Sequence, residues 1–448
     1  MPEPAAGIPS RREIVQLAIP ALGALAAEPL YLLADTAIVG HLGSAPLAGL
    51  AIAGTALASL LTISTFLEYG TTGAVARLLG AGRRAEALDV AVQATYLAIA
   101  TGLLITGLLE LVASPLVDLL GGSDAATKEQ AVSWLRIAAL GAPFVCVTLA
   151  GQGWLRGMRD TVTPFVVIIS GNVVSAALSA TLVYGAHMGI RGSAVANAVA
   201  QSGSAAIFAW ALHRRGARMR FSLRRAATQL AAARDLGVRT IAFLGSFTVA
   251  TAVAAHIGGP SVAAHQIAIQ LWSFLAYSLD SLAIAAQAMV GRAVGAGDVG
   301  GARVLSWRLV RWGTWVGAGI AVLLLAGFTV IPRLFTSDPA VLDAAHQAWP
   351  WFAAMEPAAG AVFALDGILI GAGDTRYLGW TTTAAGILVY VPLALLAGSL
   401  GWGLAGVWIG LTSFILARLV ACVWRLAGDT WYVAGRRHVE AAELLAVP

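Results

Sequence analysis

The sequence has 448 residues, of which 58% are apolar and only 11% are charged. Soluble domains carry about 25% charged residues, so this composition excludes an ordinary water-soluble protein and indicates that lipid surrounds much of the chain. The net charge of +5 does not indicate a nucleic-acid partner, because the arginines stand in short segments between long apolar runs.

Runs of about 20 apolar residues mark helices that span a membrane. The sequence predicts twelve of them, with boundaries uncertain by a few residues. In chain order they lie at about 14–40, 47–70, 88–112, 130–152, 163–185, 190–213, 238–256, 262–290, 310–332, 346–372, 378–399 and 403–425.

Arginine is concentrated at alternate ends of these spans, whereas the connections at 41–46, 256–261 and 398–403 are short and nearly uncharged. The arginine-rich ends hold Arg11 and Arg12; Arg77, Arg83 and Arg84; Arg156 and Arg159; Arg214, Arg215, Arg218, Arg220, Arg224 and Arg225; Arg292, Arg303 and Arg308; Arg376; and Arg425, Arg436 and Arg437. Because arginine is retained on the cytoplasmic side, we expect a multi-pass protein with both termini in the cytoplasm.

The two halves of the chain repeat each other with an offset of 214 or 215 residues. The matched pairs are His41-Leu42-Gly43 with His256-Ile257-Gly258, Arg77 with Arg292, Gly80-Ala81-Gly82 with Gly295-Ala296-Gly297, Gly157 with Gly371, and Asp160-Thr161 with Asp374-Thr375. The offset covers six spans, an even number, so the halves share one orientation, as in parallel-repeat transporters.

The predicted fold is therefore an all-α integral membrane protein, with twelve transmembrane helices in two parallel six-helix repeats around a central cleft. The expected domains are an N-lobe at 1–213, a basic cytoplasmic linker at 214–237, a C-lobe at 238–425 and a cytoplasmic tail at 426–448. Two lobes that rock against one another are a transport architecture, which does not by itself name a substrate.

The repeat separates residues that recur in both halves from residues that occur once. The acids Glu28, Asp35 and Glu68 correspond to Phe243, Ala250 and Ala283, and the stripe Asn172, Ser175 and Ser179 corresponds to Gly386, Val389 and Leu393. A carboxylate in a bilayer costs about 2.5–3.5 kcal/mol, so such acids usually face a cavity and mark a path for ions or protons.

These differences give the candidate site residues. Proton or cation coupling is assigned to Asp35, Glu28 and Glu68, a substrate cavity to Tyr31, Asn172, Ser175, Ser179, Asn197 and Gln201, and a secondary C-lobe role to Asp280 and Asp366. Structural alternatives stay open: Asp35 facing water at a helix end, Glu28 bonded within a helix contact, Glu68 reaching an interface, and the Asn/Ser stripe joining helices. The position of Asp366 is polar in both halves, because its repeat counterpart is Gln152, and this favours a structural role for Asp366.

Several motifs together resemble the multidrug and toxic compound extrusion (MATE) family, most closely its DinF-like branch. They are Pro20 with ADTAIVGHLG at 34–43, TTG at 71–73, LRGMRDT at 155–161, AAHQIA at 263–268 and GILIGAGD at 367–374. The resemblance covers essentially the whole chain.

The resemblance implies export of organic, often cationic, compounds from the cell across a bacterial plasma (inner) membrane, by alternating access and antiport with H+ or Na+. In the DinF-like branch a first-helix aspartate is the protonation site, and Asp35 matches it, which favours H+. The family's fifth-helix pattern Asn-x-x-Asn-x-x-x-Asp reads Asn172-x-x-Ser175-x-x-x-Ser179 here, so the second acid is missing. Glu28 or Glu68 is a candidate to replace it.

Rival functions are an Na+-coupled antiporter of the same family, a lipid-linked-precursor flippase of the same superfamily and a major-facilitator transporter. The last usually has a Gly-x-x-x-Asp-Arg-x-Gly-Arg loop, which 80–86 does not match. A membrane-embedded enzyme is not expected, because no Asp-Asp-x-x-Asp cluster or phosphate-binding loop occurs. We expect no catalytic residues, no metal site and no cofactor beyond the coupling ion, and partners limited to an organic substrate and the bilayer, with the protein a monomer.

Overall fold

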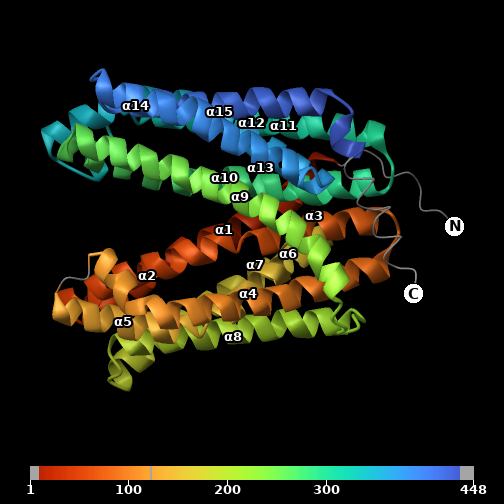
Figure 1. Ribbon diagram of the computed structural model, residues 1–448, viewed down its shortest axis with the longest axis horizontal. Helices are drawn as coiled ribbons and strands as arrows, with labels where there is room; N and C mark the ends of the chain where they lie inside the picture. Colours follow the sequence, from red (N-terminus) through yellow and green to blue (C-terminus); the bar gives the residue numbers. More distant parts are fainter. Residues whose placement is uncertain (1–9, 122–123, 434–448) are drawn as a thin grey trace. The chain divides into compact units, whose positions relative to one another are not determined.

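The computed structural model describes residues 10–121 and 124–433, and every regular element in these ranges is a helix (Figure 1). The helices are α1 (Arg11–Gly40), α2 (Ser44–Ile63), α3 (Phe66–Gly80), α4 (Arg84–Leu119), α5 (Ala125–Ala139), α6 (Ala142–Gly157), α7 (Val162–Ala180), η1 (Thr181–Gly185), α8 (Ile190–Arg214), α9 (Leu223–Ile257), α10 (Gly259–Gly295), α11 (Val299–Ala326), η2 (Pro332–Leu334), α12 (Pro339–Ala372), α13 (Thr375–Ala384), η3 (Ala385–Tyr390), α14 (Val391–Ser399) and α15 (Gly403–Ala427).

The expected helical membrane architecture is confirmed. In the described residues, eleven helical segments are long and apolar enough to cross a membrane, and the bent pair α5–α6 supplies a twelfth span. The two helices of that pair meet at an angle of 50°. The second span is also interrupted, at Ser64 and Thr65 between α2 and α3. These breaks were not visible as gaps in the apolar pattern.

The chain forms two compact units. Of the described residues, unit 2 contains 19–79 and 83–233, and unit 1 contains 10–18, the turn Gly80–Gly82 and 234–433. The division at 233/234 falls within the segment expected to be the linker. From Leu223 onward that segment is helical and continuous with the seventh span, because it forms the start of α9. Residues 434–448 of the expected tail lie outside the described residues.

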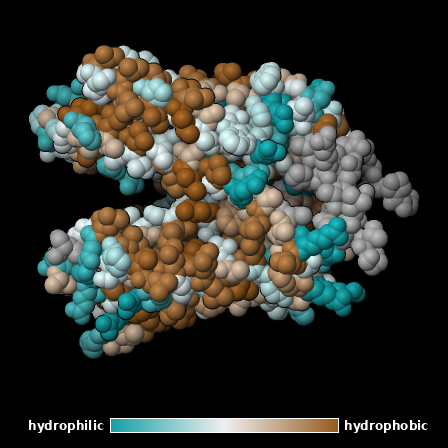
Figure 2. Space-filling model, viewed as in Figure 1, coloured by the Kyte–Doolittle hydropathy of each residue, from teal (hydrophilic) through white to brown (hydrophobic). Residues whose placement is uncertain are grey.

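Each unit has its own apolar core, and apolar side chains also cover the outside of its helices. In unit 2, Leu104 and Leu111 on α4 are among the exposed large side chains, and in unit 1 so are Val322 and Leu323 on α11. Figure 2 shows apolar surface along the helices, with hydrophilic residues gathered nearer their ends. This distribution suits helices that contact lipid along their length.

Small residues allow close helix contacts inside unit 1. A Cβ atom built at Gly313 of α11 would collide with the carbonyl oxygen of Gly360 on α12, and a Cβ at Gly360 would collide with that of Gly313. One helical turn later, a Cβ at Gly317 would meet the backbone of Glu356. The Gly-x-x-x-Gly spacing of α11 therefore brings two backbones together, as small residues do in membrane helix pairs.

Candidate functional site

A buried carboxylate lies between three helices of unit 2. Asp35 on α1 is 3% exposed, and it accepts hydrogen bonds from Ser179 Oγ on α7 (3.0 Å) and Ser193 Oγ on α8 (2.8 Å). In the described part of the chain, no cationic side chain forms an ion pair with it. Its partners are neutral hydroxyls, which can donate to a carboxylate or accept from a protonated carboxyl group.

The same three helices meet again one turn earlier on α1. The Tyr31 hydroxyl oxygen accepts hydrogen bonds from Ser175 Oγ and from Asn197 Nδ2, each at 3.0 Å. Tyr31 and Ser175 are buried, and Asn197 is half-buried. Tyr31 and Asp35 lie four residues apart, so their side chains share one face of α1. The site is therefore a two-layer hydrogen-bonded cluster.

Asn172 forms the next layer of this contact. Its Nδ2 atom donates to the carbonyl oxygen of Ala27 at 3.0 Å, and its side chain also interacts with that of Glu28, which is exposed. The polar stripe of α7 thus pairs in order with the face of α1. The structure thus brings Asp35 and Tyr31 together with this stripe. Glu28 lies at the edge of the group.

The contribution of α8 differs in part from the expectation. Ser193, which the sequence reasoning missed, donates directly to Asp35, whereas Gln201 is half-buried and makes no hydrogen bond to the cluster among the described residues. A signal for Ser193 was present, because Ser193, Asn197 and Gln201 follow one another at intervals of four on one helix face.

Glu68 lies apart from this cluster, in an ion pair of its own. It is buried on α3 and pairs with Arg156 of α6, which is 1% exposed. Arg156 also donates through Nη2 to Gln152 Oε1 at 2.8 Å. The Glu68 carboxylate is thus neutralised locally, and its role in coupling stays a prediction.

The secondary candidates occupy unit 1. Asp366 on α12 is buried and forms ion pairs with Arg239 of α9 and Arg418 of α15. Two cations hold this carboxylate, which suits the structural role that its repeat position indicated. Asp280 on α10 is half-buried and has an interaction of its own.

Unit 1 also buries an acid that is not among the candidate site residues. Glu356 on α12 is 0% exposed, and neither carboxylate oxygen has a hydrogen-bond partner in the described part of the chain. The repeat counterpart of Asp35 is Ala250, which is buried in the hydrophobic core of this unit. Unit 1 therefore lacks the counterpart of the Asp35 cluster at the matching position.

Three arginines are buried inside helices. They are Arg77 in α3, Arg156 in α6 and Arg418 in α15. Arg156 and Arg418 are each paired with an acid, which explains why the membrane interior tolerates them. Among the described residues, no three His, Cys, Asp or Glu side chains gather as a metal site.

Comparison with known proteins gives consistent relatives over nearly the whole chain. The family model MatE matches residues 20–181 and 236–396, one segment in each half. The chain is 33% identical to Protein DETOXIFICATION 44, chloroplastic, of Arabidopsis thaliana, over 93% of this chain and 82% of the relative. It is 31% identical to DNA damage-inducible protein F of Escherichia coli K12, over 95% of each chain.

Solved structures show the same fold. A crystal structure of a mutant of the Vibrio cholerae MATE transporter VcmN superposes with a TM-score of 0.84 at 21% identity, covering 94% of this chain and 98% of that one.

Proposed function

Because the chain belongs to the MatE family, whose members are membrane transporters and not enzymes, we propose that it exports organic cations in exchange for protons. Relatives named as multidrug resistance proteins support drug-like compounds as substrates. The bacterial relatives support the plasma membrane as its location. Both termini are proposed to lie in the cytoplasm.

The observation that carries proton coupling is the environment of Asp35. Among the buried carboxylates, Glu68 and Asp366 have guanidinium partners that stabilise the ionised form, whereas the oxygens of Glu356 have no hydrogen-bond partner among the described residues. Among the described residues Asp35 has only hydroxyl partners, so neither protonation state is fixed by a permanent counter-charge there. Its proton can therefore be lost and regained during a transport cycle.

Coupling follows from competition for this one carboxylate. An ionised Asp35 attracts an organic cation strongly in a low-dielectric site, and protonation removes that attraction. Each ligand then lowers the affinity of the other by the same factor, which is a coupling free energy. A proton taken up from outside would release the substrate to the outside, and its loss to the cytoplasm would restore the site.

Two alternatives have weaker support. Carboxylate and hydroxyl oxygens also suit Na+, so the cluster is compatible with Na+-coupled antiport. A flippase for lipid-linked precursors needs a cationic cavity to hold a diphosphate, whereas the buried Arg156 and Arg418 are already paired with acids.

The test is efflux from proteoliposomes with ethidium as the organic cation, under a pH gradient and a Na+ gradient imposed separately. We expect efflux to follow the proton gradient and ignore Na+, and Asp35→Asn to abolish it while the protein still folds. Glu28→Gln and Glu68→Gln should slow efflux less. Efflux by Asp35→Asn at the wild-type rate would refute this mechanism and direct attention to Glu356 and the other acids.

A further inference from the structure

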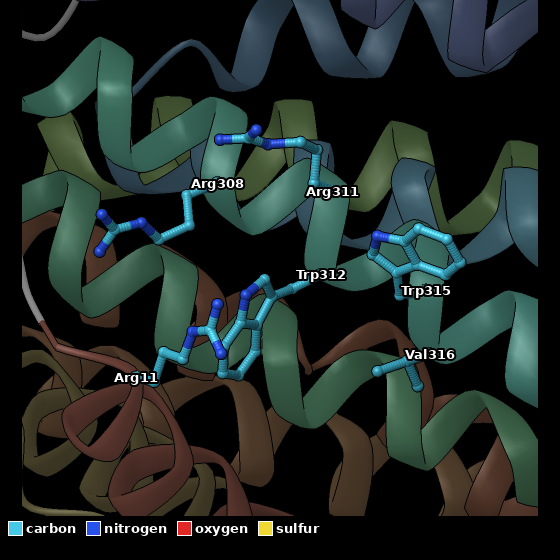
Figure 3. Close-up of a pocket in the computed structure, with 6 residues that line it drawn as sticks. All are labelled: Arg11, Arg308, Arg311, Trp312, Trp315 and Val316. Atoms are coloured by element: carbon cyan, nitrogen blue, oxygen red, sulfur yellow. The ribbon is translucent and has the colours of Figure 1, made fainter.

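A pocket with cationic and aromatic walls lies in unit 1 (Figure 3). Its volume is about 790 Å³, in the range of small-molecule sites. The lining residues in the described part of the chain are Arg11 at the start of α1 and Arg308, Arg311, Trp312, Trp315 and Val316 of α11, none of which is an acid. We call this the α1–α11 groove.

The residues from α11 follow helical spacing. Arg308, Arg311, Trp312 and Trp315 recur at intervals of three and four, so they form one stripe that begins with cations and ends with indoles. Arg311 and Trp315 are exposed, and Trp315 is 75% exposed. An indole and a guanidinium exposed side by side need an environment that suits both.

The boundary of a membrane is such an environment. The long apolar run of α11 begins directly after Arg311, and that of α1 begins shortly after Arg11. All three arginines therefore stand at the headgroup level, and the two tryptophans lie where aromatic side chains collect in membrane proteins. The arginine distribution predicts that this is the cytoplasmic leaflet, whose anionic lipids attract such clusters.

The repeat shows what the same helix face does in the other unit. Gln93 and Tyr96 of α4 correspond to Arg308 and Arg311, and there the chain itself covers the face. Gln93 Nε2 donates to the carbonyl oxygen of Arg220 at 2.7 Å, and the Tyr96 ring packs against Phe221. In unit 1 the described residues leave a pocket at this place, and the polar neutral side chains are replaced by arginines.

From this geometry we propose that the α1–α11 groove binds the phosphate headgroup of an anionic phospholipid. Arg11 and Arg311 receive the phosphate, since guanidinium groups bind phosphate through paired N–H donors. Trp312, Trp315 and Val316 contact the glycerol and the first methylenes of the acyl chains. The tail at 434–448 is a poorer occupant, because its Arg436 and Arg437 are balanced by Glu440 and Glu443.

The test uses the purified full-length protein in detergent, with phosphatidylglycerol and phosphatidylcholine of identical acyl chains. Bound lipid is counted by native mass spectrometry, and affinity is taken from the lipid-dependent rise in Tm. We expect selective binding of phosphatidylglycerol. The double variant Arg11→Gln/Arg311→Gln should weaken it on the order of thirtyfold, given the usual contribution of each cation near an anionic surface. Trp315→Leu should weaken it several-fold, because the indole at the boundary is lost.

A matched control removes two arginines from the same predicted membrane face outside the groove. Arg214 and Arg218 are exposed in unit 2, and Arg214 stacks on Trp210 with 5.2 Å between its Cζ atom and the ring centroid. Arg214→Gln/Arg218→Gln should leave phosphatidylglycerol affinity within about twofold of wild type. An equal loss of phosphatidylglycerol affinity in this control would show that the effect comes from non-specific surface charge, and it would overturn the proposal.

Two further experiments distinguish an anionic phospholipid from the other candidate occupants of the groove. Inorganic phosphate and glycerol 3-phosphate should not raise Tm at concentrations where the lipid saturates, and equal stabilisation by either would mean that the groove binds a soluble anion. Truncation after Val433 should leave lipid affinity unchanged. If the full chain binds no phosphatidylglycerol and truncation creates the binding, the tail is the occupant and the proposal is wrong.

Discussion

Arg418 and Asp366 meet inside unit 1, where Arg418 Nη2 lies 2.8 Å from each of the two carboxylate oxygens of Asp366. Arg239 pairs with the same carboxylate, so one acid joins α9, α12 and α15. Both Asp366 and Asp35 are buried, yet the first is neutralised by cations and the second is held by hydroxyls. The same substitution at the two positions should therefore have different consequences.

Asp366→Asn should destabilise the protein, because it leaves the buried Arg418 and the half-buried Arg239 without their counter-charge. Breaking a buried pair in this way typically costs about 3–5 kcal/mol. The measurement is the thermal unfolding midpoint in detergent, with the exposed Asp343→Asn as a control of the same chemistry. Asp35→Asn should unfold close to wild type. Equal destabilisation at both aspartates would contradict the division of roles.

The hydroxyl partners of Asp35 should tune transport rather than stability. Ser193→Ala and Ser179→Ala each remove one donor to the carboxylate, worth about 1.5–3 kcal/mol for a hydrogen bond to a charged group. The ionised form is stabilised less in either variant, so the proton binds more tightly. We expect the optimum of ethidium efflux to move to higher pH. The matched control is Ser202→Ala, because Ser202 is a half-buried serine of α8 whose hydroxyl donates to the backbone carbonyl oxygen of Val199. An unchanged pH profile in both site variants would count against Asp35 as the proton carrier.

The backbone contact between α11 and α12 should tolerate no side chain. Gly313→Ala places a methyl group against the carbonyl oxygen of Gly360, and overpacking of this kind costs about 1–3 kcal/mol. Gly319→Ala, two turns along the same helix, meets nothing within 4 Å and should be neutral or slightly stabilising. Thermal unfolding of the two variants compares them directly. If Gly319→Ala lowers the unfolding temperature as much as Gly313→Ala does, the helix contact is not the cause of the destabilisation.

The predicted orientation can be tested by cysteine labelling, because both native cysteines, Cys146 and Cys422, are buried. Arg218→Cys should react with a membrane-impermeant maleimide only after the cell is opened, whereas His41→Cys should react in intact cells. The reason is the arginine bias between alternate span ends. The opposite reactivity at the two positions would reverse the assigned topology, and with it the leaflet that faces the α1–α11 groove.

The fold was largely predictable, because length and hydropathy alone define a membrane helix. The breaks at Ser64–Thr65 and at Leu140–Gly141 were not, since the residues around them remain apolar and no proline marks the first. The segment at 214–237 was predicted only as a linker, because its polar face lowers its hydropathy. Its residues nevertheless have helical spacing, and from Leu223 onward they form the start of α9. Propagation from a neighbouring span lets such a segment stay helical.

The site was predictable where the repeat offered a comparison. Asp35 and Ser179 differ from their counterparts Ala250 and Leu393, so both stood out before any contact was known. Ser193 was missed although it continues the four-residue spacing of Asn197 and Gln201, because a serine hydroxyl within a helix often bonds only to its own backbone. The ion pair of Glu68 with Arg156 was missed because its members are 88 residues apart and Arg156 lies close to a loop. Only the bend between α5 and α6 and the packing of α3 bring them together.

The Arg239–Asp366–Arg418 cluster also bears on how the protein is made. The chain enters the membrane from its N-terminus, so Arg239 arrives first, Asp366 next and Arg418 last. Asp366 therefore meets a cation that is already in place, and Arg418 meets an acid. Arg239, which is the least buried of the three, is therefore the only one that is inserted before a partner is present. The order of synthesis thus keeps the costliest charges from standing unpaired in lipid, and Arg239→Gln should reduce the yield of inserted protein even where the finished molecule stays folded.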